Sequence, residues 1–147
     1  MNSNAAISMG TPCLCHALRK ASRGVTRLYD EELRRIGLRT TQFSLLAYLS
    51  RVGEVRQSNL GELMLLEETT VSRNLRPLIN AGWVAVRDGT DRREKLVTIT
   101  AAGTETFKRA LPVWVEAQTK MKSLLSDKLW KTLLDVLPEV AKASVKK

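Results

Sequence analysis

The apolar residues between Glu68 and Gly82 recur with the period of an α-helix. Four of them stand at i, i+4, i+7 and i+8, and these are Val71, Leu75, Leu78 and Ile79. That spacing places them on one stripe of a helix with 3.6 residues per turn. The stripe predicts a helix that packs one face against a core and leaves the opposite face to solvent or to a partner.

The face opposite this stripe, with its flanks, carries side chains that can contact DNA: Thr69, Thr70, Ser72, Arg73, Asn74 and Arg76. In the major groove, arginine pairs with guanine, asparagine pairs with adenine, and threonine or serine bonds to base edges or phosphate. The exposed amino end of the helix adds backbone amides and a positive dipole end that favour phosphate. We therefore interpret this segment as a recognition helix, although an ordinary solvated surface has similar polarity.

Three helices are predicted before this segment. The first runs from Cys13 to Ile36 and carries a heptad-like seam formed by Leu14, Leu18, Ala21, Val25 and Leu28. The second has the sequence TQFSLLAYLSRVG, with Thr40 or Thr41 as its N-cap, and its apolar residues on more than one face predict a central position. Ser58 is expected to cap a short third helix. The third and fourth helices together predict a helix-turn-helix.

Two β-branched runs after the recognition helix predict a β-hairpin. They are WVAVR (83–87) and KLVTI (95–99), joined by the polar segment DGTDRRE. Adjacent arginines at such a tip are typical of a wing that inserts arginine into the minor groove while the helix occupies the major groove. The predicted DNA contacts are Thr41, Ser58, Thr69, Thr70, Ser72, Arg73, Asn74, Arg76, Asp91, Arg92, Arg93 and Lys95.

Two further helices are predicted at the C-terminal end. Thr100 caps the first, whose apolar stripe is expected to be Phe107, Leu111, Trp114, Met121 and Leu125. Ser126 and Asp127 begin the last, which bears Leu129, Leu133, Leu137 and Val140. Bends are expected at Pro77, Pro112 and Pro138. The first and last helices carry more apolar surface than a helix-turn-helix core needs, which predicts a two-fold dimer on a pseudo-palindromic site.

The predicted fold class is therefore mainly α with a small β-hairpin, a winged helix-turn-helix flanked by long N- and C-terminal dimerisation helices. Residues 1–12 are expected to form a flexible tail and 13–147 a single domain. Within that domain, 13–36 and 101–145 form the predicted dimerisation part and 40–100 the DNA-binding part.

Composition narrows the classes of function. The 147 residues carry a formal net charge of +9 and a pI near 10.0, which favours an anionic polymer as partner. No apolar run is long enough for a membrane span or a signal peptide, so we expect a cytoplasmic protein without a membrane partner. We expect no cofactor and no enzyme, because there is no phosphate-binding loop and the single histidine has no triad.

The alternative function is a basic winged-helix module that binds RNA or docks another protein, since winged domains do both. An aromatic content of only 5% disfavours RNA, because RNA readers tend to present aromatic side chains on which bases stack. The pairing of a polar helix with an arginine-tipped wing favours the two grooves of B-form DNA instead.

The first helix contains the candidate effector residues. Cys15 lies in its first turn among arginine and lysine, the surroundings in which thiols become reactive, or else it is a small buried residue at the dimer seam. Cys13, Cys15 and His16 lack the fourth ligand of a metal site, so no metal is predicted. A competing prediction is a pocket for a small anionic aromatic effector, lined by His16, Arg19, Tyr29 and Trp114.

Three motifs resemble a known family. They are TTVSRNLRPLINAGWV (69–84), Asp91-x-Arg93, and LVTITAAG (96–103), and at this mutual distance the combination is specific. From about residue 13 to 145 the chain resembles the MarR (multiple antibiotic resistance regulator) family of winged-helix transcription factors. The resemblance implies a homodimer, usually a repressor, in which Arg93 reaches the minor groove and Asp91 holds the wing in place.

A weaker resemblance covers the segment CLCHALRKASRGVTRLY. It is similar to the start of the organic-hydroperoxide sensors of that family, which implies that Cys15 is oxidised and that Tyr29 bonds to it. The sequence departs from the sensors at Arg19 and Thr40, where further tyrosines are expected.

Overall fold

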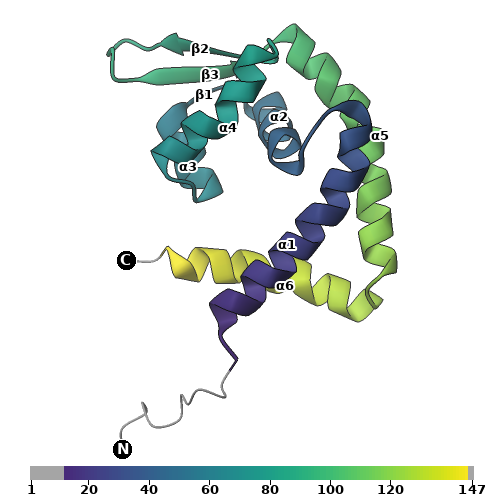
Figure 1. Ribbon diagram of the computed structural model, residues 1–147. Coiled ribbons are helices and arrows are strands. Elements are labelled where there is room, and N and C mark those ends of the chain that lie inside the picture. The colour runs from purple at the N-terminus through teal and green to yellow at the C-terminus, as the bar shows by residue number, and fades with distance from the viewer. Residues whose placement is uncertain (1–11, 146–147) are drawn as a thin grey trace, which may run out of the picture.

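The computed structural model describes residues 12–145 as six α-helices, a short 3-10 helix and three strands (Figure 1). The order is α1 (Leu14–Leu33), η2 (Arg34–Ile36), α2 (Thr40–Val52), β1 (Glu54–Arg56), α3 (Gln57–Met64), α4 (Glu68–Asn80), β2 (Val84–Asp88), β3 (Lys95–Ile99), α5 (Ala101–Ser123) and α6 (Asp127–Ser144). The predicted fold class, a mainly helical winged helix-turn-helix with long terminal helices, is confirmed. Apart from Pro12, the predicted N-terminal tail lies outside the described residues.

The core surrounds α2, as its apolar residues on several faces predicted. Leu45, Leu46 and Leu49 of this helix are fully buried. They belong to one cluster with buried leucines and valines of the helix-turn-helix and the sheet, among them Leu60, Val71, Leu75, Leu78 and Val97. Each such side chain contributes about 1.5–3 kcal/mol on burial, so this cluster fixes the helix-turn-helix and the sheet relative to each other.

The predicted hairpin is part of a three-stranded antiparallel sheet with the order β1-β3-β2. Strand β1 was not predicted, because three residues with one apolar side chain give no readable alternation. It pairs with β3 so that Val55 lies opposite Val97. The wing therefore has a third strand that ties its base to the end of α2.

Glycines follow the ends of two helical segments, η2 and α4. Gly37 and Gly82 both adopt a positive φ, where a side chain would be strained. At Gly82, the carbonyl oxygen of Leu78 accepts from the amide of Trp83 at 2.9 Å, and that of Ile79 accepts from Gly82 at 3.0 Å. This is the Schellman arrangement, which ends α4 and turns the chain into β2.

Two predicted N-caps were wrong and two were confirmed. Helix α2 begins at Thr40 itself, with Arg39 as its N-cap. The backbone amide and the hydroxyl of Thr40 both donate to the carboxylate of Asp30 in α1, each at 2.7 Å. Ser58 lies inside α3, which begins one residue earlier with Arg56 as its N-cap. Thr100 and Ser126 do cap α5 and α6, each accepting from the amide three residues ahead. The helices continue through Pro77, Pro112 and Pro138.

The buried face of α5 is not the predicted stripe. Its buried side chains are smaller and lie one position away, at Thr106, Ala110, Val113 and Ala117. The predicted large residues lie at the margins, where Phe107 and Trp114 are half-buried against Phe43 with ring centroids 5.5 and 5.7 Å away. Small side chains allow close helix packing, and α1 packs along α5.

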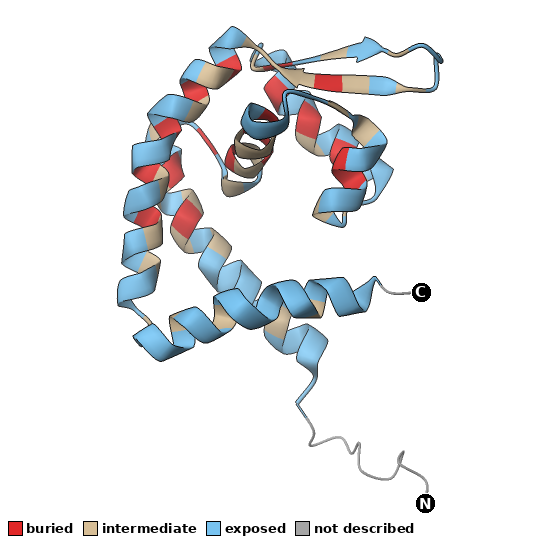
Figure 2. Ribbon diagram, turned by 180° about the vertical axis from the view of Figure 1, so that it is seen from behind, coloured by how far each residue is buried: buried red, intermediate tan, exposed pale blue. Residues whose placement is uncertain are grey.

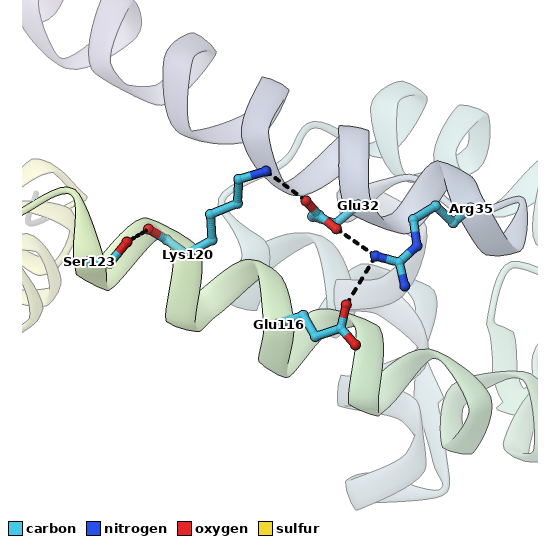
Figure 3. A network of polar contacts seen from close by, with 5 residues as sticks. All are labelled: Glu32, Arg35, Glu116, Lys120 and Ser123. Carbon is cyan, nitrogen blue, oxygen red and sulfur yellow. Dashed lines mark hydrogen bonds and ion pairs between the residues drawn. The ribbon is translucent and has the colours of Figure 1, made fainter.

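A polar network joins α1 to α5 at their contact (Figure 3). The Glu32 carboxylate of α1 accepts from Lys120 at 2.9 Å and from Arg35 at 2.8 Å, and Arg35 also reaches Glu116 at 3.0 Å. The bond from Lys120, followed by that from Arg35, holds the pKa of Glu32 below its ordinary value. The Ser123 hydroxyl donates to the Lys120 carbonyl at 2.6 Å, so it bonds to the backbone at the end of α5.

Helix α6 has no buried residue, although it carries a row of leucines. Figure 1 places it beyond the far end of α5, and Figure 2 colours it almost entirely as exposed. Leu129, Leu134 and Leu137 are exposed, as are Leu14 and Val25 of α1.

Candidate nucleic-acid interface

Helix α4 presents the predicted polar side chains on its outer side. Val71, Leu75 and Leu78 are buried as predicted, whereas Ile79 is 41% exposed and does not belong to the core stripe. Thr69, Ser72, Arg73 and Arg76 are exposed, while Thr70 and Asn74 are half-buried on the flanks. The outer face of α4 therefore begins with threonine and continues into arginine.

Helix α3 holds α4 through a close backbone approach. A Cβ atom on Gly61 would lie 3.0 Å from the Leu66 carbonyl oxygen and 3.2 Å from a methyl of Val71. The turn between the helices passes through Leu65, a non-glycine residue at φ +53°. Gln57 Nε2 also donates to Ser72 Oγ at 2.9 Å, a link that no local pattern predicted.

Two depressions flank the exposed side of α4. The first, of about 500 Å³, is lined by Glu68, Thr69, Ser72, Arg73 and Arg76. The second, of about 690 Å³, lies between α4 and the sheet and is lined by Gln57, Glu68, Ser72, Leu75, Arg76, Ile79, Asn80, Val86 and Lys95. Glu68, Ser72 and Arg76 line both and form the ridge between them. Glu68 was not among the predicted site residues.

The wing turn is organised by Asp91. Its carboxylate Oδ1 accepts from the backbone amide of Arg93 at 3.1 Å, and its carbonyl oxygen accepts from the amide of Glu94 at 2.9 Å. The Gly89 amide closes the loop on the Glu94 carbonyl at 2.8 Å. Arg92 and Arg93 are consequently carried at the exposed tip.

Most other charged residues at the base of the wing form ion pairs with one another. Arg87 of β2 binds both carboxylate oxygens of Glu54 at 2.7 and 3.0 Å, and this contact raises the pKa of Arg87. Arg56 pairs with Glu94, and Lys95 pairs with Asp88. The predicted contact Lys95 is thus already engaged. Within residues 12–145, Arg92 and Arg93 form no ion pair, so the tip retains the net positive charge of the wing.

The two remaining predicted DNA contacts lie at helix starts. Thr41 and Ser58 are exposed in the first turns of α2 and α3. Backbone amides at a helix start favour phosphate oxygens.

The predicted effector residues do not come together within one protomer. Cys15, His16 and Arg19 are exposed in the first turns of α1, and both cysteines are free. Tyr29 is buried further along α1, where its hydroxyl donates to Gln118 of α5 and burial raises its pKa. Fourteen residues of helix separate Cys15 from Tyr29 by about 21 Å. Trp114 stacks on Phe43 in the core.

Neither a metal centre nor a membrane span is found in the described part of the chain. Residues 12–145 contain no cluster of three or more side chains suited to a metal ion. None of the described helices combines the length and the apolar character that a membrane crossing requires.

A helix-turn-helix with a polar outer helix, beside a sheet with two free arginines at its tip, defines a winged-helix DNA-binding protein. The sequence profile described as "MarR family" matches residues 36–94, from the last residue of η2 to the residue before β3. The chain belongs to the MarR family of transcriptional regulators.

Solved structures extend the likeness beyond the matched segment. The regulator MosR of Mycobacterium tuberculosis, crystallised with DNA, is 32% identical, with 92% of this chain and all of that chain covered and a TM-score of 0.78. A cysteine-to-serine mutant of Escherichia coli MarR, crystallised with operator DNA, has the same fold at 21% identity, with 86% and 92% coverage and a TM-score of 0.76.

A relative found by sequence comparison belongs to the same class of transcriptional regulators. An uncharacterized HTH-type transcriptional regulator of Bacillus subtilis, YwoH, is 34% identical over 87 residues, which is 59% of this chain and 64% of that protein. Together, the fold and these relatives identify the chain as a DNA-binding transcriptional regulator.

Proposed function

We propose that the protein is a homodimeric repressor that binds a pseudo-palindromic operator and is released by a small effector. The operator would be bound by two copies of α4 in successive major grooves, with the two wings in the adjacent minor grooves. Bound across a promoter, such a dimer excludes the transcription machinery.

The observation that carries the proposal is the uncovered apolar surface of α1 and α6. Leu129, Leu134 and Leu137 of α6 are exposed in the described protomer, and Leu14 of α1 is 67% exposed. Large contiguous apolar surface of this kind marks an association site, and a second copy of the same helices supplies the matching surface. Because α1 and α5 form one packed arm, dimer geometry would set the spacing of the two α4 helices.

An oxidant is the effector that the exposed thiol supports best. Cys15 is exposed and free on a helix that carries Arg19 and Lys20 in its next turn. Hydrogen peroxide would transfer one oxygen to Sγ, forming a sulfenic acid, while its O–O bond breaks and the other oxygen leaves as water; an organic hydroperoxide would leave as the alcohol. An anionic aromatic ligand is the second candidate, and Arg19 beside Leu18 in a shallow depression of α1 supports it.

The test is footprinting on the DNA upstream of the encoding gene, with excess random competitor and with peroxide as the variable. We expect two protected half-sites about 34 Å apart and protection that peroxide abolishes. Cys15→Ser should retain protection in peroxide, and Cys13→Ser, whose thiol is equally exposed, is the matched control. A footprint of one half-site by a monomer would overturn the dimeric repressor, and release by peroxide in Cys15→Ser would overturn the thiol sensor.

A further inference from the structure

Glu68 is a carboxylate at the N-terminal end of α4, on the exposed side of the helix. It is the first residue of the helix, is exposed, and lines both depressions beside α4. Within residues 12–145 no lysine, arginine or histidine pairs with it, although seven ion pairs form elsewhere. Its neighbours on this surface are Thr69, Ser72, Arg73 and Arg76.

A free carboxylate on a DNA-facing surface has few favourable positions. Phosphate repels it, and the acceptor atoms that fill most of the major groove repel it as well. Amino groups of the bases are the donors available there, and cytosine N4 is the usual partner of glutamate. The N-terminal residues of a recognition helix are those that contact base edges, and the positive end of the helix dipole stabilises a carboxylate there.

We propose that Glu68 determines sequence specificity by accepting a hydrogen bond from the N4 amino group of a cytosine at one fixed position of the bound site. Ser72, one turn further along, is held by Gln57, so this row of α4 enters the groove with its geometry set. The inference rests on the proposed function, because it requires α4 to enter the major groove.

The experiment is selection of binding sites from a random DNA pool by the full chain and two variants, Glu68→Ala and Glu67→Ala. Glu67 is the matched control, because it is exposed and adjacent, lines neither depression, and makes no capping bond through its side chain. Both variants remove one negative charge, so both should bind random DNA somewhat more tightly.

We expect the wild-type protein and Glu67→Ala to select cytosine at one fixed position, and Glu68→Ala to lose that preference by about fivefold or more. In a third variant, Glu68→Gln, the preference should shift toward adenine, the usual partner of an amide side chain. Retention of the cytosine preference by Glu68→Ala would overturn the inference while leaving the proposed function intact. Failure of the wild-type protein to enrich any sequence would overturn both.

Discussion

At the scale of single residues, a substitution of Arg73 can distinguish sequence-specific binding from non-specific electrostatic binding to DNA. It is exposed on the outer face of α4 and lines the first depression. In Arg73→Ala, we expect affinity for the selected site to fall about 5- to 100-fold, because a bidentate arginine–guanine pair is lost. Affinity for random DNA should change little by comparison. Fluorescence anisotropy on both duplexes measures the ratio.

Arg51→Ala is the control for this substitution, since Arg51 is an exposed arginine at the end of α2 and lies outside α4 and the wing. It removes the same charge without removing a proposed base contact. Equal loss of affinity on selected and random duplexes in Arg73→Ala would reduce Arg73 to a phosphate contact.

For Asp91, the expected change in DNA affinity is opposite to the change that its charge alone would predict. Removing an acidic residue near DNA should strengthen binding, but the Asp91 carboxylate also fixes the Arg93 amide in the wing turn. We therefore expect Asp91→Ala to weaken binding, because the arginines lose their fixed position. Asp91→Asn keeps an acceptor oxygen and should bind as well as the wild type or better. Titration of the same duplex at one salt concentration compares them, and tighter binding by Asp91→Ala would contradict this role.

The residues that could be predicted from sequence are those whose role depends on near neighbours. The outward placement of Arg73 follows from helical period alone, and the Thr100 cap follows from the three residues after it. The Gln57–Ser72 bond and the Glu54–Arg87 pair join residues 15 and 33 positions apart. No local signal in the sequence specifies such pairs. The sequence therefore could not predict which charged residues of the wing are left without an ion pair.

At the scale of elements, the same distinction separates the hairpin from β1. Strands β2 and β3 adjoin in sequence and carry runs of β-branched residues. Strand β1 is defined by its pairing with β3, about forty residues later. The face of α5 was likewise misassigned because its partner, α1, lies at the other end of the chain. Close packing selected alanine and threonine over the larger residues of the predicted stripe.

The contact between α1 and α5 should make stability depend on pH through Glu32. Its folded pKa is held below the ordinary value of 4.5, mainly by the bond from Lys120. A lowered pKa contributes stability above the unfolded pKa, and this contribution is lost as pH falls through the folded pKa. We expect Glu32→Gln to lower the Tm by a few degrees at pH 7, and this difference to shrink steadily below about pH 4.5.

Glu105→Gln is the control for the pH series, because Glu105 pairs with Lys108 only at 3.5 Å on an exposed helix face. Such surface pairs contribute little, so its Tm should match the wild type at every pH. A Tm difference for Glu32→Gln that stays constant from pH 7 to pH 3 would exclude ionisation of Glu32 as its cause. Differential scanning fluorimetry across this pH range measures both variants.

At the scale of the whole molecule, the proposed DNA-binding and dimerisation surfaces lie on different elements. The outer side of α4 and the wing tip carry exposed threonine, serine and arginine, whereas α6 and the first turn of α1 carry exposed leucine. Figure 2 colours the wing tip and most of α6 as exposed. The packed α1–α5 arm connects them. This division could be predicted from the sequence, since the terminal helices carry more apolar surface than one protomer buries. How two copies would meet in the proposed dimer depends on the shape of both surfaces together, and the periodicity along one chain does not contain that shape.

Because the two surfaces are separate, a substitution on α6 should disrupt the proposed dimer without altering the proposed DNA-binding surface. Leu137 of α6 is 42% exposed in the protomer, so Leu137→Glu should leave the helical circular dichroism spectrum unchanged. In the proposed dimer it would bury a charge in an apolar interface, and sedimentation equilibrium should then give the mass of one chain. Affinity for a two-half-site duplex should fall about 10²- to 10⁴-fold, because the second α4 is no longer tethered to the first.

Val52→Glu is the matched control for this experiment. Val52 lies at the end of α2 and is 43% exposed, so the variant places the same charge at a side chain of the same exposure away from α1 and α6. It should retain the mass of the dimer and bind both half-sites. If Leu137→Glu also retains the mass of the dimer, the α6 surface has another role. If both variants dissociate, the added charge itself, and not its position, is the cause. Only dissociation of Leu137→Glu alone would assign the dimer interface to α6.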